Sequence, residues 1–91
     1  MKPREKEYCK ILGNALRNLR INHANKSLNL FARENEIPNS TLSHIELGQN
    51  QSGIINLKKI ASSFEMSLPE LITILEKDLP KNFRIFEDDH Y

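Results

Sequence analysis

The stretch IPNSTLSHIELG, residues 37–48, decides how this chain folds. Pro38 disfavours helical backbone at the residue before it, and Gly48 is a typical helix stop, so the stretch predicts a turn followed by one short helix. Helical spacing would bury Leu42 and Ile45 on one side of that helix. Small amides, hydroxyls and imidazoles on the other side would suit the edges of bases in a DNA major groove. The side chains of this polar face belong to Asn39, Ser40, Ser43 and His44.

Apolar residues at helical spacing predict further helices on both sides of this stretch. Ser27 is a suitable cap for the helix before it, and Ser67 with Glu70 forms a capping box for the last helix, which Pro80 ends. No run of residues reads as a strand, so we expect an all-α domain whose second and third helices form a helix-turn-helix. The expected helices span residues 4–23, 28–35, 39–47, 55–64 and 68–77.

Length and composition limit the class of protein. The 91 residues suffice for one domain with a modest core. No run of about 18 apolar residues is present for a membrane helix, and the N-terminus lacks the apolar segment of a secretion signal. Because Cys9 is the single cysteine, no internal disulfide is expected, and the sequence favours a cytoplasmic protein.

Charge is unevenly distributed along the chain, although the net charge is only +1. Residues 1–47 carry eight Lys/Arg and five Asp/Glu, whereas residues 60–91 carry three Lys/Arg and seven Asp/Glu. A basic first half joined to an acidic last third is typical of a protein with one face turned towards phosphate.

Four segments together resemble the Cro/C1-type (XRE) helix-turn-helix family. The resemblance covers about residues 11–75 and implies a compact, five-helix, lambda-repressor-like DNA-binding domain. Phage repressors, antitoxins of toxin–antitoxin operons and controller proteins of restriction–modification systems share this fold. The segments are LRNLR at 16–20, SLNLFA at 27–32, STLSHIELG at 40–48 and LKKIASSFEMSLPEL at 57–71.

The resemblance also implies roles for individual residues. Asn39, Ser40, Ser43 and His44 would contact bases, and Arg20 with Glu46 would tie the first helix to the third. The sequence departs from the family pattern at several positions: Glu36 replaces a turn glycine, Leu28 replaces a glutamine that contacts DNA, Leu47 replaces a polar residue before the glycine, and Ser52-Gly53 replaces a proline-led turn. Residues expected near the DNA backbone are Ser27, Leu28, Thr41, Arg17, Asn50 and Lys58. Arg17 is equally compatible with a solvated helix surface. Lys58 and Lys59 are adjacent in a helix and cannot both face DNA, and Lys58 is the better candidate for the contact.

Catalysis is not expected from this sequence. His44 and Glu46 form an H-x-E pair, but the P-C-x-x-C of zinc deaminases is absent from the chain. The histidines at 23, 44 and 90 show no metal-ligand spacing, and no glycine-rich phosphate loop is present. We therefore expect no enzyme activity, no cofactor and no metal.

The sequence favours a homodimeric transcriptional regulator, in its most specific form a repressor, that reads pseudo-palindromic double-stranded DNA. The alternative is an antitoxin-like or other protein-binding module of a toxin–antitoxin or restriction–modification operon. We expect a DNA-binding domain over residues 1–78 and a tail over residues 79–91. In that tail, Phe83, Ile85 and Phe86 would either make a dimer contact, in a short strand, or fold back over the first helix.

Overall fold

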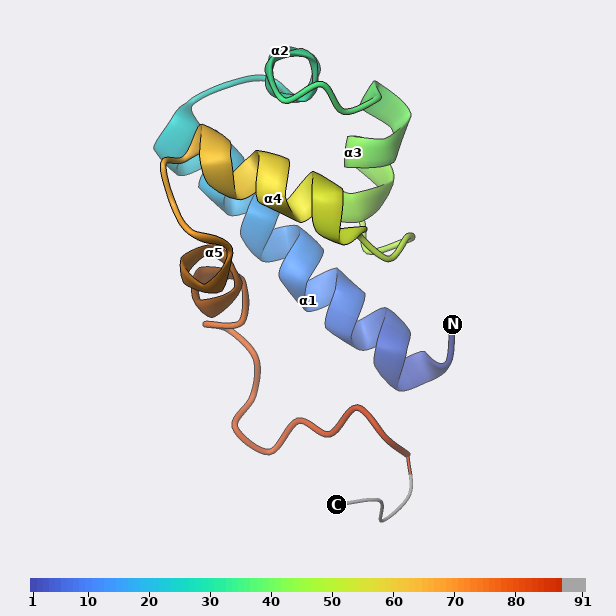
Figure 1. The fold of residues 1–91 in the computed structure, drawn as a ribbon. Coiled ribbons are helices and arrows are strands. Elements are labelled where there is room, and N and C mark those ends of the chain that lie inside the picture. The colour runs from blue at the N-terminus through green and yellow to red at the C-terminus, as the bar shows by residue number, and fades with distance from the viewer. Residues whose placement is uncertain (88–91) are drawn as a thin grey trace.

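The computed structural model describes residues 1–87, and over that range the chain forms five α-helices and one π-helical turn (Figure 1). No strand occurs within the described range, so the expected all-α, five-helix fold is confirmed. The end of the tail, with His90, lies outside the described residues. The elements are α1 (Pro3–Leu19), η1 (Arg20–Ala24), α2 (Leu28–Glu34), α3 (Asn39–Glu46), α4 (Ile54–Ser63) and α5 (Leu68–Leu75).

Local capping sets where α2 and α5 begin. The backbone N–H of Leu30 donates to Ser27 Oγ (3.2 Å), which satisfies one of the free amides in the first turn of α2. At α5 the backbone N–H of Glu70 donates to Ser67 Oγ (3.3 Å), and the N–H of Ser67 donates to Glu70 Oε1 (3.0 Å). This reciprocal pair is the capping box that the sequence predicts, with Pro69 in the first turn.

The first helix reaches as far as predicted, but its last turn is not α-helical. Residues Arg20–Ala24 form a π-helical turn that follows α1 directly. Asn25 then adopts a left-handed backbone with φ of 54°, which ends the helix before the connector to α2. Asparagine accepts this conformation more readily than most residues.

Each of the five α-helices contributes at least one fully buried side chain to a single core. In Figure 1, α4 is drawn in front of α1. Helices α2 and α3 lie together near one end of the bundle, and α5 packs on another side. α1 contacts both α3 and α5. A shared core of this kind fixes the helix-turn-helix against the rest of the domain. The largest fully buried side chains are Leu16, Phe31, Leu42, Ile60, Leu71 and Leu75.

Gly13, which costs helix stability in α1, is explained by the close approach of α3. A Cβ at this position would lie 2.3 Å from the carbonyl oxygen of Ile45 and 2.7 Å from that of Glu46. Only glycine leaves room for the end of α3 to cross α1 this closely.

The described part of the tail, residues 79–87, folds back along the first half of α1 (Figure 1). The rings of Phe83 and Tyr8 lie 6.0 Å apart, and Arg4 Nη1 donates to the carbonyl oxygen of Arg84 (3.0 Å). The spacing of Phe83 and Ile85 therefore does not produce the short strand that it would allow. Phe86 is 48% exposed, so part of the apolar tail still faces solvent.

Candidate nucleic-acid interface

The turn between α2 and α3 is held by buried hydrogen bonds. The backbone N–H of Ile37 donates to the carbonyl oxygen of Ala32 (2.9 Å), and Asn35 Nδ2 donates to that of Phe31 (2.8 Å). Asn35 is buried, so its amide acts within the protein. Glu36, at the position of the family glycine, takes the left-handed backbone itself, with φ of 55°.

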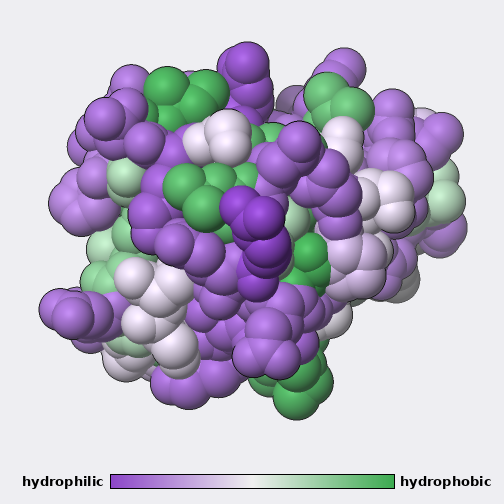
Figure 2. All heavy atoms as spheres, turned by 90° about the horizontal axis from the view of Figure 1, so that it is seen from above, coloured by the Kyte–Doolittle hydropathy of each residue, from purple (hydrophilic) through white to green (hydrophobic). Residues whose placement is uncertain are grey.

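Helix α3 separates its buried and polar sides sharply. Leu42, Ile45 and Glu46 are buried, while Asn39, Ser40 and His44 are exposed. Ser43 and Thr41 are half-buried at the margins of the exposed face. Hydrophilic residues also cover most of the molecular face that Figure 2 presents, which is the upper side of Figure 1, where α2 lies.

The exposed face of α3 is connected to its neighbours at both ends. At the start, Asn39 Nδ2 donates to Oδ1 of Asn29 in the first turn of α2. At the other end, Asn50 Nδ2 lies 3.4 Å from His44 Nδ1. The loop after α3 and the first turn of α2 therefore flank the polar face of α3, and together they form one continuous surface.

Arg20 and Glu46 fix α3 to the end of α1. Arg20 Nε donates to Glu46 Oε2 (2.7 Å) and Arg20 Nη2 donates to Glu46 Oε1 (2.9 Å), in a bidentate pair. The two side chains are only 8% and 4% exposed. Arg20 Nη1 also donates to the carbonyl oxygen of Lys26 (2.9 Å), just before the cap of α2. The hydrogen bond with Glu46 raises the pKa of Arg20, so the guanidinium stays charged.

The residues expected near the DNA backbone lie in differing environments. Ser27 Oγ is occupied in capping α2, and Leu28 is half-buried against the core. Arg17 is exposed on α1. On α4, Lys59 Nζ donates to the carbonyl oxygen of Glu36 (3.1 Å), whereas Lys58 is exposed. The two lysines thus differ, as their adjacent positions in a helix require.

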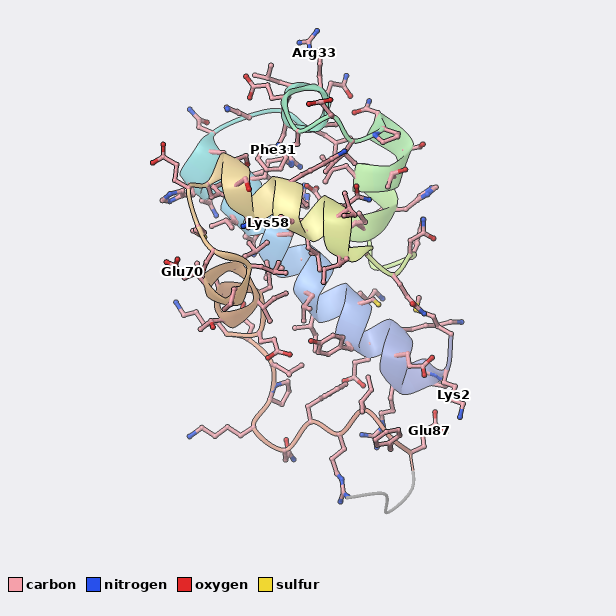
Figure 3. All side chains as sticks on the ribbon, viewed as in Figure 1. Lys2, Phe31, Arg33, Lys58, Glu70 and Glu87 are labelled. Carbon is pink, nitrogen blue, oxygen red and sulfur yellow. The ribbon has the colours of Figure 1, made fainter. Side chains whose placement is uncertain are left out.

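Side chains also differ along α2. Figure 3 shows Arg33 pointing away from the body of the protein, while Phe31 points into it. Lys26 Nζ lies 2.5 Å from Glu34 Oε1, and both side chains are well exposed, so this ion pair adds little to stability. Arg33 is the exposed cation of this helix.

Sequence reasoning missed the role of Asn29. Its contact with Asn39 depends on how α2 and α3 cross, and no periodicity or spacing in the sequence pairs residue 29 with residue 39. The contact of Asn50 with His44 was also missed, although Asn50 itself was a candidate. Gly48, with φ of 73°, turns the chain so that this loop returns towards α3.

No helix in residues 1–87 is long and apolar enough to cross a membrane. No group of three or more His, Cys, Asp or Glu side chains comes together as a metal site in that part of the chain.

This geometry is that of a helix-turn-helix DNA-binding protein. A family model described as helix-turn-helix matches residues 16–71, and the chain belongs to the Cro/C1-type (XRE) helix-turn-helix family. The chain is also similar to Control protein C.MunI of Mycoplasma sp., with 32% identity over 66 residues, which is 72% of this chain and 89% of that protein. No solved structure gave a significant match. The protein is a DNA-binding transcription regulator.

Proposed function

We propose that the protein is a homodimeric repressor that reads a pseudo-palindromic operator with α3 in the major groove. The observation that carries the proposal is the exposed face of α3, where an amide, hydroxyls and an imidazole stand together on a helix fixed by a buried ion pair. Such groups can donate to and accept from base edges. The proposed base contacts come from Asn39, Ser40, Ser43 and His44.

Contacts to the DNA backbone would come from the margins of the same surface. Asn50 flanks the end of α3, and Thr41 lies half-buried beside the exposed face. At the start of α2, Ser27 and Leu28 would approach a phosphate, through backbone amides because the Ser27 hydroxyl already caps the helix. Arg17 and Lys58 are exposed cations that would add electrostatic attraction.

A dimer follows from the size of the reading surface. One short helix offers few base contacts, and two copies double them while matching the symmetry of a palindromic site. We assign the DNA-binding domain to residues 1–78 and keep a dimer contact for the tail, residues 79–91, because Phe86 remains exposed there. We also place the protein in the cytoplasm with its DNA, which the single cysteine supports.

Selection from random duplex DNA with the purified full chain tests this function. We expect an enriched inverted repeat whose half-site centres lie about 10–10.5 base pairs, or a multiple, apart. Sedimentation of the complex should give two chains per duplex, and a reporter promoter overlapping the site should lose expression. Absence of any enriched sequence would remove DNA reading, and a lone half-site bound by one chain would remove the dimer.

The second candidate is an antitoxin-like or other protein-binding module of a toxin–antitoxin or restriction–modification operon, and the similarity to a control protein supports the restriction–modification setting. In that case the tail would serve the partner. Truncation after Lys81 separates the two roles of the tail. Loss of the dimer in sedimentation, with the helical signal retained, would support the dimer contact, whereas an unchanged dimer would leave the tail for another partner.

A further inference from the structure

A cavity of about 390 Å³ lies between α1, α5, the loop after α3 and the tail. Its volume falls in the range of about 300–1,000 Å³ that is common for small-molecule sites. Most of its walls are apolar or aromatic, and Ile85 of the tail forms one of them. The apolar walls include Tyr8, Leu12, Leu57, Ile72, Leu75 and Ile85.

One polar group in this cavity has no partner of its own. Ser52 Oγ is buried, and it makes no hydrogen bond with any described residue. A hydroxyl can donate one hydrogen bond and accept two, and buried polar groups in proteins are nearly always paired. Ser52 lines the cavity, so a polar atom of a bound molecule would satisfy it.

The charges around the cavity restrict the kind of molecule that fits. Among the described residues of the lining, the charged groups are the carboxylate of Glu5 and the terminal amine of Met1, and no Lys or Arg side chain takes part. Glu5 Oε1 already accepts the backbone N–H of Lys2 (2.9 Å). The two opposite charges offset each other, so a carboxylate or phosphate ligand would lose its hydration without gaining a net opposite charge, whereas a neutral molecule would not carry that cost.

We propose that this cavity binds a small, neutral, largely apolar molecule carrying one hydroxyl or amide group, which pairs with Ser52. The tail already encloses the cavity on one side through Ile85, so a compact molecule suits the space better than the surface of a second chain.

The cavity also lies next to α3, the helix proposed to contact bases. Asn50 lines the cavity, and its side-chain amide lies 3.4 Å from Nδ1 of His44 on the exposed face of α3. An occupant that shifts the loop at residues 49–53 would therefore change the position of His44. This coupling rests on the proposed function, whereas binding in the cavity does not.

Fluorescence titration with 2-naphthol, without DNA, tests the site on the full chain. The protein has no tryptophan, so the naphthol signal can be excited without protein background. We expect saturable binding with a blue shift, and at least about tenfold weaker binding of 2-naphthoate, the anion of the same ring. Ser52→Ala should weaken naphthol binding about three- to tenfold, because one hydrogen bond is lost. Ser62→Ala, at an exposed position of α4 outside the cavity, is the matched control and should leave binding unchanged.

Ile72→Phe should abolish naphthol binding by filling the cavity. Circular dichroism checks that this variant folds, and if it does not, Ser52→Ala decides, since the Ser52 side chain makes no hydrogen bond that the fold would lose. Equal affinity for naphthol and naphthoate, or unchanged affinity in Ser52→Ala, would overturn the proposal. The proposal would also be overturned if naphthol bound only the monomer and dissociated dimers in sedimentation. The natural occupant of the cavity would then be a second chain.

A separate experiment measures the effect of naphthol on DNA binding. Naphthol should change the affinity of the wild type for its selected operator and leave that of Ser52→Ala unchanged. Because the titration contains no DNA, failure of the site and failure of the proposed function give different results.

Discussion

Replacing Glu46 by alanine tests whether the buried ion pair holds the reading helix in place. In the structure, Glu46 accepts two hydrogen bonds from Arg20, at 2.7 and 2.9 Å. The substitution leaves the guanidinium with a single partner, the carbonyl oxygen of Lys26. Arg20 is only 7% exposed, so water cannot readily replace the lost carboxylate.

The expected loss is large because a charge stays buried without its partner. Breaking a buried pair on one side costs about 3–5 kcal/mol, and we take about 3 kcal/mol here because Arg20 keeps its bond to the backbone. For a domain of this size that corresponds to a fall of roughly 12–24 °C in Tm. The double substitution Arg20→Met with Glu46→Leu should recover most of the lost stability, since neither side chain then carries an unpaired charge.

Thermal and urea denaturation followed by circular dichroism measure this effect. Glu34→Ala is the matched control, because it removes an exposed carboxylate from an ion pair whose side chains are 38% and 46% exposed. We expect that control to lose less than about 1 kcal/mol. If Glu46→Ala is no less stable than Glu34→Ala, the ion pair does not hold α3 and the reasoning is wrong.

Three other substitutions probe the frame around α3. Gly13→Ala should lower stability by about 1–3 kcal/mol in urea denaturation despite the better helix propensity of alanine, because the new methyl group would lie 2.3 Å from a carbonyl oxygen of α3; equal or higher stability would contradict the close crossing. Glu36→Gly should raise stability by about 0.5–1 kcal/mol, since φ of 55° strains a glutamate and does not strain a glycine, and a lower Tm would argue against that backbone. Burial and the hydrogen bond to Glu76 raise the pKa of Tyr8 to about 12, above the ordinary value of about 10 in the unfolded chain. The stabilisation of the folded state by the neutral Tyr8 phenol is therefore complete below about pH 10 and is lost as pH rises towards about 12. Tyr8→Phe should therefore remove part of the alkaline loss of stability between pH 8 and 11.5 in urea denaturation, and an identical pH profile would refute it.

Helix positions were predictable wherever the sequence carries a local signal. Ser27, Ser67 and Pro38 each act through neighbouring backbone, so α2, α3 and α5 begin where the sequence indicates. The π-helical turn at Arg20–Ala24 was not predictable, because the apolar spacing there fits an α-helix equally well.

Contacts between elements were harder to foresee. The position of the pair Arg20 and Glu46 followed from family resemblance, whereas the contact of Asn29 with Asn39 depends on the crossing of two helices. The tail shows the same limit. Alternating apolar residues fit a strand, but Phe83 packs on Tyr8, which lies 75 positions earlier in the chain.

The central claim is that the exposed face of α3 reads DNA sequence. Fluorescence anisotropy with the selected operator and a scrambled duplex tests it in wild type, Asn39→Ala and Ser43→Ala. Each substitution should weaken operator binding by about 1–3 kcal/mol, roughly 5- to 150-fold, with little change for the scrambled duplex. Asn22→Ala, at an exposed position of η1 away from α3 and the tail, should bind like the wild type. Unchanged operator affinity in both α3 variants, with unchanged circular dichroism, would contradict the account.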